Sequence, residues 1–220
     1  MEMLLASCIH DMKNAISMIL NSVDQLSSEE AEDEKTLKNL TTLRYEASRL
    51  NNDLIHLLGV YRIKENGLPI VIDEHEVRET IHDQLLKNEQ LFKKYDVEVT
   101  LNCDDWLEGY YDNELVGSII NNVLVNTVRY THKKIQIDAE NQGDFLSIRI
   151  SDDGQGYPES MCSQSDNPQL GINFQSGSTG LGLYFAGKVA AMHRKGDTVG
   201  YISITNGGPL GGGVFSLHLP

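Results

Sequence analysis

The sequence predicts an α-helical hairpin over residues 1–65, forming a four-helix bundle on dimerisation, followed by an α+β sandwich with a mixed sheet and helices on one face over residues 66–220. Two heptad patterns of apolar residues fill the first part. Asn66-Gly67-Leu68-Pro69 then interrupts the second pattern. Beyond this break, strand-like runs alternate with helical periods, as expected for helices packed on a sheet.

The composition limits the partners that this chain is expected to have. Its 220 residues are 40% hydrophobic, which is ordinary for a globular protein, and no run of eighteen apolar residues is present. A formal charge of −14 makes nucleic acid and anionic membranes unfavourable partners. The three cysteines, an odd number without a short paired spacing, favour a reducing compartment. We therefore expect a cytoplasmic protein that binds neither nucleic acid nor membrane.

The first predicted helix, over about residues 2–27, displays a histidine. Its apolar residues recur at alternating spacings of four and three, which places them in one stripe. His10 lies roughly opposite that stripe, with Asp11 beside it and Asn14 on the same polar face. A displayed histidine next to a carboxylate is a candidate nucleophile, although most surface histidines have no chemical role.

The second predicted helix, over about residues 34–65, carries an equally long apolar stripe from Leu40 to Tyr61. An acidic turn over residues 27–34 separates the two helices, so we expect an antiparallel hairpin. One hairpin cannot enclose two stripes of this length. The simplest completion is a second copy of the hairpin, which predicts a homodimer. The alternative is that the hairpin packs on its own second domain.

The second part of the chain contains further elements in a clear order. We expect helices over about residues 74–93, 113–130 and 180–193. A long loop rich in Gly, Ser, Asp, Gln and Pro is expected over residues 152–179, and long loops in compact domains are usually functional. Strands are expected near residues 69–72, 97–103, 107–110, 135–140, 145–151, 200–205 and 213–219.

Asn122 and Asn126 lie four residues apart in the helix expected over residues 113–130 and therefore project from one face. An asparagine oxygen is a hard, neutral ligand suited to Mg²⁺, which keeps most of its waters and bridges phosphates. Arg129 can meet a phosphate with charge-assisted hydrogen bonds, and Tyr130 offers an aromatic face to a base. Asparagine pairs are also common on solvent-facing helices.

Two glycine-containing segments follow. In Asp152-Asp153-Gly154-Gln155-Gly156, a carboxylate at the end of a strand can accept a hydrogen bond from an exocyclic amine such as that of adenine. From Gly177 to Leu183, a glycine-rich loop runs into a helix start, whose exposed amides and dipole favour an anion. This loop lacks the lysine of a phosphate-binding loop. The order and spacing of the three segments are more specific than any one of them.

These three segments give residues 66–220 a resemblance to the ATP-binding catalytic domain shared by histidine kinases and the gyrase, heat-shock and MutL ATPases. The closing run from Gly211 to Pro220 resembles the last strand of that family. His10-Asp11-Met12-Lys13-Asn14 resembles the phosphoacceptor box of sensor histidine kinases. The resemblance covers almost the whole chain.

The resemblance implies a role for each candidate residue. Asn126 would bind Mg²⁺ with help from Asn122, and His10 would attack the γ-phosphate of ATP. Asp11 would orient the imidazole and accept its proton, and Asn14 would hold a water for dephosphorylating the response regulator. The remaining nucleotide-binding positions would be Arg129 (phosphate), Tyr130 (base), Asp152 (adenine amine), Gly154, Gly156, Thr179, Gly180, Leu181 and Gly182.

The resemblance also implies partners. The phosphoryl group would pass from His10 to an aspartate of a response-regulator receiver domain. No room for a sensor or a membrane segment precedes His10, so the chain is either a fragment of a longer protein or a kinase that receives its input from a separate sensor protein. Ala15 stands where many relatives have proline, which is expected to remove a kink from the helix.

Two other functions are compatible with parts of this pattern. A histidine phosphotransferase, which relays phosphate without using ATP, has the same architecture but need not retain the asparagine and glycine segments. An ATPase or serine kinase of the wider family would have no use for the box around His10. The leading hypothesis is therefore an ATP-dependent histidine kinase, which in bifunctional members is also a phosphatase.

Overall fold

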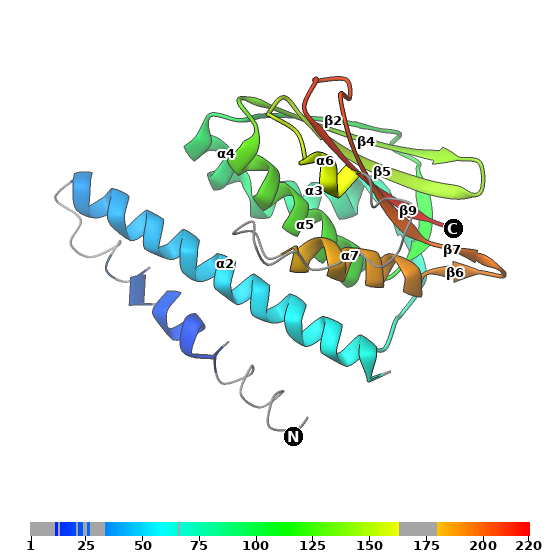
Figure 1. Ribbon diagram of the computed structural model, residues 1–220, viewed down its shortest axis with the longest axis horizontal. Coiled ribbons are helices and arrows are strands. Elements are labelled where there is room, and N and C mark those ends of the chain that lie inside the picture. The colour runs from blue at the N-terminus through cyan, green and yellow to red at the C-terminus, as the bar shows by residue number, and fades with distance from the viewer. Residues whose placement is uncertain are drawn as a thin grey trace. The chain divides into compact units, whose positions relative to one another are not determined.

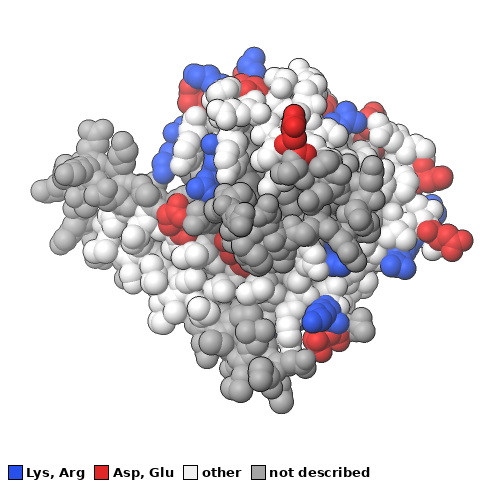
Figure 2. Space-filling model, in the orientation of Figure 1, with Lys and Arg blue, Asp and Glu red and all other residues white. Residues whose placement is uncertain are grey.

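The computed structural model describes residues 12, 14–20, 22–23, 26, 34–65, 67–162 and 180–220. The chain divides into two compact units, Met1–Leu68 and Pro69–Pro220. Figure 2 shows that acidic and basic side chains lie intermixed on the face that it displays. Within the described residues, no helix is long and apolar enough to cross a membrane.

The first unit contains the long helix α2 (Glu34–Lys64), which Figure 1 shows as one continuous rod. The helix predicted over residues 34–65 is thus confirmed. It ends with Arg62 and Lys64, whose charges interact favourably with the negative end of the helix dipole. Residues 14–20 are also helical, as expected. The turn over residues 27–33 lies outside the described residues.

The second unit is an α+β fold, as predicted. A mixed five-stranded sheet has the order β2-β4-β5-β9-β8, in which only β2 and β4 run parallel to each other. Two short antiparallel ribbons, β1–β3 and β6–β7, accompany it. The elements are β1 (Asp73–Glu76), α3 (Val77–Lys87), α4 (Glu89–Tyr95), β2 (Glu98–Cys103), β3 (Glu108–Tyr111), α5 (Asn113–Tyr130), β4 (Lys134–Gln142), β5 (Phe145–Asp152), α6 (Glu159–Cys162), α7 (Leu181–Met192), β6 (Arg194–Lys195), β7 (Thr198–Val199), β8 (Tyr201–Asn206) and β9 (Gly213–Leu219).

The core of this unit lies between the sheet and helices α3, α5 and α7, which cover one of its faces (Figure 1). Alternate strand residues point toward the helices, as the period of two requires. Burial of these apolar side chains is the main force holding the layers together. The fully buried strand residues include Ile135, Ile137, Ile148, Ile150, Phe215, Leu217 and Leu219.

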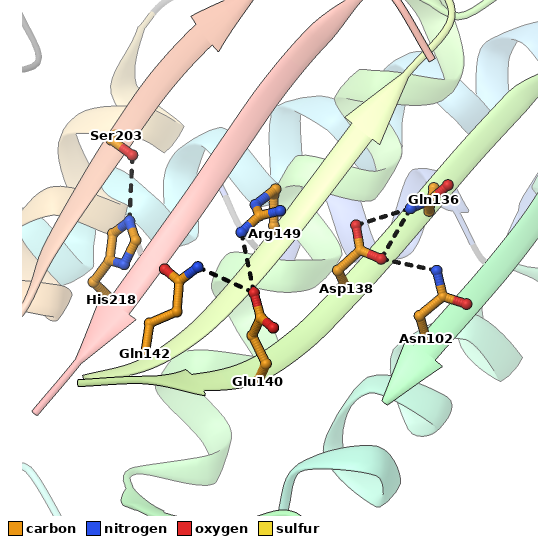
Figure 3. Close-up of polar contacts among 8 residues, drawn as sticks. All are labelled: Asn102, Gln136, Asp138, Glu140, Gln142, Arg149, Ser203 and His218. Atoms are coloured by element: carbon orange, nitrogen blue, oxygen red, sulfur yellow. Dashed lines mark hydrogen bonds and ion pairs between the residues drawn. The ribbon is translucent and has the colours of Figure 1, made fainter. Parts of the chain in front are cut away.

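The opposite face of the sheet is polar (Figure 3). Asp138 on β4 accepts hydrogen bonds from Asn102 on β2 and from Gln136, while Arg149 on β5 contacts Glu140 at 3.4 Å. A depression of about 350 Å³ lies among these side chains. The charged and amide side chains around this depression bond to one another.

Two predicted elements are wrong in their position. The strand expected at residues 69–72 lies at Asp73–Glu76 instead, because β1 takes its register from β3, while the Val71 N–H donates to the carboxylate of Asp112. The helix expected over residues 74–93 is broken at Asn88 into α3 and α4. The buried Asn88 side chain donates to the carbonyl oxygen of Gln84 and to Asn121 Oδ1. The contacts Val71–Asp112 and Asn88–Asn121 join residues 41 and 33 positions apart in the sequence, and a periodicity does not reveal such contacts.

Three short elements were not predicted. Helix α6 lies within the segment that was expected to be a loop, and the β6–β7 ribbon follows α7. Each is too short to show a periodicity of its own. The long helix predicted over residues 113–130 is confirmed at both ends.

Candidate functional site

Helix α5 provides the platform of the candidate site. Asp112 caps its start, because Asp112 Oδ1 accepts from the Leu115 N–H at 3.0 Å. The Asp112 N–H donates to Nε2 of the buried His193 at 3.0 Å. The other ring nitrogen of His193 therefore carries the proton and donates to the Val189 carbonyl oxygen at 2.9 Å. This bridge ties the beginning of α5 to the end of α7, and burial lowers the pKa of His193.

The two predicted amides lie one turn apart on α5. Asn126 Nδ2 donates to Asn122 Oδ1 at 3.3 Å, so the side-chain oxygen of Asn122 already accepts a hydrogen bond. Among the described residues, none donates a hydrogen bond to Asn126 Oδ1, and Asn126 is exposed. The arrangement leaves the Asn126 oxygen available as a ligand, with Asn122 orienting it.

Asn122 also faces the start of α7. Its Nδ2 is buried and has no hydrogen-bond partner among the described residues. A Cβ at Gly182 would lie 2.3 Å from this nitrogen, so only glycine permits such a close approach. A buried donor without a partner next to a helix start fits an anionic group such as a phosphate.

The beginning of α7 has the backbone expected of an anion site. Gly180 adopts a left-handed conformation with φ 57°, and no side chain caps the helix there. Leu181 is buried and anchors the first turn. The first backbone N–H groups of the helix are thus without an intrahelical partner. Thr179 lies outside the described residues.

Asp152 stands at the end of β5 and is only 7% exposed. Its Oδ1 accepts from the backbone N–H groups of Gly154 at 2.8 Å and Gly213 at 3.2 Å. Its backbone carbonyl oxygen accepts from the Gly212 N–H at 3.0 Å. One carboxylate oxygen is thereby fixed, and Oδ2 accepts no hydrogen bond from the described residues. A carboxylate held in this way can accept from a ligand's amine.

Asp153 connects this turn to the end of α5. Its Oδ1 accepts from the Thr131 hydroxyl and from the backbone N–H groups of residues 132–134. Partial burial raises the pKa of Asp153, but these hydrogen bonds outweigh it and hold the pKa well below its ordinary value. A Cβ at Gly154 would lie 2.0 Å from the Tyr130 carbonyl oxygen, so the turn lies directly against the helix end.

The fold therefore brings together the three segments that the sequence singled out, on α5, the turn after β5, and α7. Arg129 and Tyr130 lie exposed at the end of α5. Gly156, with φ 79°, completes the turn. In the first unit Asn14 is exposed on a helix, whereas His10 and Asp11 lie outside the described residues.

The sequence interpretation missed the loop between β8 and β9. Gly212 and Gly213 donate to Asp152, and Asn206 bonds to the backbone of Tyr157. The glycines of this loop, Gly207-Gly208 and residues 211–213, are the signal in the sequence that points to a close backbone contact there.

The chemistry of this donor set fits a Mg–nucleotide complex. An amide oxygen, a partnerless amide nitrogen and a helix start suit a metal bridged to phosphates, which needs few protein ligands. The described residues contain no cluster of three or more His, Cys, Asp or Glu side chains that could hold a metal ion.

Comparisons with known proteins agree with this geometry. Residues 111–220 match the family model described as histidine kinase-, DNA gyrase B-, and HSP90-like ATPase. The chain is 29% identical to sensor histidine kinase RcsC of Salmonella typhimurium, with all of this chain and 23% of RcsC covered. It is 26% identical to sensor histidine kinase CpxA of Escherichia coli, with 83% of this chain and 40% of CpxA covered. The chain thus spans less than half of either relative.

Solved structures show the same fold. Histidine kinase AdeS of Acinetobacter baumannii superimposes with a TM-score of 0.62 at 20% identity, over 94% of this chain and 95% of that one. The catalytic domain of histidine kinase ThkA gives 0.58 at 21% identity, over 68% of this chain and 97% of that one. The chain belongs to the histidine kinase-, DNA gyrase B- and HSP90-like ATPase family, and it has the fold of the histidine kinase structures on which it superimposes.

Proposed function

We propose that this chain is the core of a two-component histidine kinase, which phosphorylates His10 from ATP and passes the phosphoryl group to an aspartate of a response-regulator receiver domain. The observation that carries the proposal is the convergence of Asn126, Asp152 and the start of α7 in one unit. A relay protein that does not use ATP has no need of this arrangement.

In the proposed complex each group has one task. Asp152 Oδ2 accepts from the adenine amine, because Oδ1 is occupied by two backbone N–H groups. Asn126 Oδ1 is a ligand of Mg²⁺, and Asn122 Nδ2 donates to a phosphate oxygen. When bound, Mg²⁺ neutralises charge on the phosphates. The chain contributes positioning and electrostatic stabilisation, which are the main requirements of phosphoryl transfer.

The transfer step follows from the box around His10. A ring nitrogen of His10 attacks the γ-phosphorus, the bond to the β-phosphate oxygen breaks, and ADP leaves. The imidazole proton passes to the Asp11 carboxylate. Asn14, exposed one turn further along the helix, would orient a water for the reverse task of dephosphorylating the regulator.

We further propose that the first unit is the hairpin that forms the homodimer. Leu43, Leu50 and Leu57 follow one another at intervals of seven on α2 and are 53%, 49% and 39% exposed. A row of large apolar side chains with this spacing is a helix-packing surface. A second copy of the hairpin would cover the row and complete a four-helix bundle. The input would come from a separate sensor protein or from a part of the protein beyond this chain.

Labelling with γ-³²P-ATP tests the proposal. Wild-type protein should acquire an acid-labile, alkali-stable label, as phosphohistidine does, and His10→Gln should abolish it. His82→Gln is a matched control, because His82 is an exposed helical histidine far from the asparagine and glycine segments in sequence. The proposal is refuted if His10→Gln is labelled as well as the wild type.

A measurement of ATP binding distinguishes the histidine kinase from the alternative, a histidine phosphotransferase. Calorimetry with ATP and Mg²⁺ should show Mg²⁺-dependent binding to the wild type. No binding, together with phosphorylation of His10 by a phosphorylated receiver domain, would favour the relay protein.

A further inference from the structure

Asn206, the last residue of β8, makes two reciprocal hydrogen bonds with the backbone of Tyr157. Asn206 Oδ1 accepts from the Tyr157 N–H at 2.7 Å, and Asn206 Nδ2 donates to the Tyr157 carbonyl oxygen at 2.8 Å. A primary amide offers a donor and an acceptor side by side, as this pairing requires. The two residues are 49 positions apart, so this pair joins two distant parts of the chain.

The pair fixes the far end of the turn that contains Asp152. Gly156, in a left-handed conformation, lies so close to Asn206 that an added Cβ would be 2.5 Å from Oδ1. Among the described residues, the backbone of Gln155, Gly156 and Tyr157 makes no hydrogen bond other than those to Asn206.

The near end of the same turn is attached to the same hairpin. Gly212 and Gly213 donate to Asp152, and Gly207 donates to the Gly212 carbonyl oxygen at 2.9 Å. The loop between β8 and β9 therefore holds the turn at both ends, through glycine N–H groups at Asp152 and through the Asn206 amide at Tyr157. Asp153 holds the start of the turn to the end of α5, whereas residues 155–157 depend on Asn206 for their backbone hydrogen bonds to the described residues. Losing the Asn206 attachment therefore frees the far part of the turn.

We propose that Asn206 is a positioning residue for recognition of the adenine base. It keeps the turn in the conformation in which Asp152 Oδ2 and the Tyr157 ring, which packs against Gly213, define the base pocket. The inference rests on the proposed binding of ATP at Asp152. Asn206 acts through the turn and does not itself touch the nucleotide.

The test measures selectivity for the base as well as affinity. Dissociation constants for ATP and for inosine triphosphate, whose ring carries a carbonyl oxygen in place of the amine, are determined with Mg²⁺ for the full chain. In Asn206→Ala we expect ATP affinity to fall about three- to tenfold, while inosine triphosphate affinity changes less, so that the preference for ATP narrows. Asn102→Ala is the matched control, because Asn102 is an exposed strand asparagine that bonds to Asp138 on the polar face of the sheet.

Loss of folding alone would lower both affinities together. A thermal scan of each variant identifies that case, and Asn206→Ser, which keeps one hydrogen-bonding group, then replaces the alanine variant. Unchanged preference for ATP in a folded Asn206 variant overturns the inference. A wild-type protein that binds both nucleotides equally overturns the assignment of Asp152, and with it the inference.

Discussion

Replacing Asp153 with alanine removes the acceptor that attaches the turn after β5 to the end of α5. Asp153 Oδ1 receives hydrogen bonds from Thr131 Oγ1 at 2.5 Å and from the N–H groups of His132, Lys133 and Lys134 at 2.9, 3.0 and 3.1 Å. All four donors converge on Oδ1, and the Lys133 N–H also donates to Oδ2 at 3.2 Å. Because the donors share one carboxylate, each contributes less than an isolated charged hydrogen bond. At about 0.5–1 kcal/mol each, Asp153→Ala should cost about 2–4 kcal/mol of unfolding free energy.

Two further variants sharpen this prediction. Asp153→Asn keeps a neutral oxygen and should lose about half as much. Asp144→Asn, in the exposed turn between β4 and β5, should change stability by less than about 0.5 kcal/mol. Urea denaturation followed by circular dichroism measures all three.

The pH dependence provides an independent check. Because the pKa of folded Asp153 lies below its ordinary value, the unfolded chain takes up a proton first as the pH falls. Stabilisation by Asp153 is therefore fully present above about pH 5 and decreases as the pH falls through about 4 and below. The difference between wild type and Asp153→Ala should shrink over that range. A difference below about 1 kcal/mol at pH 7, or one that does not depend on pH, would refute the reasoning.

Three further substitutions are expected to change ATP binding, stability or the dependence of ATP binding on Mg²⁺. Gly154→Ala should weaken ATP binding more than tenfold by calorimetry, because its Cβ would lie 2.0 Å from the Tyr130 carbonyl oxygen; near-normal affinity would contradict this. The hydrogen bond from the Asp112 N–H to His193 requires a neutral imidazole. Because burial lowers the pKa of His193 in the folded protein, the unfolded chain takes up a proton first as the pH falls. The stabilisation that His193 provides is therefore present above about pH 6.5 and is lost as the pH falls below that value. Urea denaturation of the wild type and His193→Gln should therefore give a difference that shrinks from pH 7.5 to pH 5.5. Asn126→Ala should abolish the dependence of ATP binding on Mg²⁺, and a retained dependence would place the metal elsewhere.

Local signals in the sequence were sufficient to predict where the long helices begin and end. The bounds of α5 were predicted correctly, because its apolar period is regular. The same holds for α2, predicted over residues 34–65 and observed over Glu34–Lys64. Elements whose position depends on a distant partner were predicted less well. Strand β1 follows the register of β3, and the break at Asn88 depends on a hydrogen bond to Asn121.

The sequence by itself determined the α+β class, the order of the three candidate segments and the candidate residues proposed to bind the nucleotide, because helical periods, glycines and polar side chains are visible in one dimension. Only the tertiary structure decided that one oxygen of Asp152 is occupied while the other is available, and that Asn206 holds the far end of the turn. The Gly213 N–H that binds Asp152 comes from 61 residues further along the chain. Every residue except proline has such a group, so no side-chain pattern marks the one that folding brings to the site.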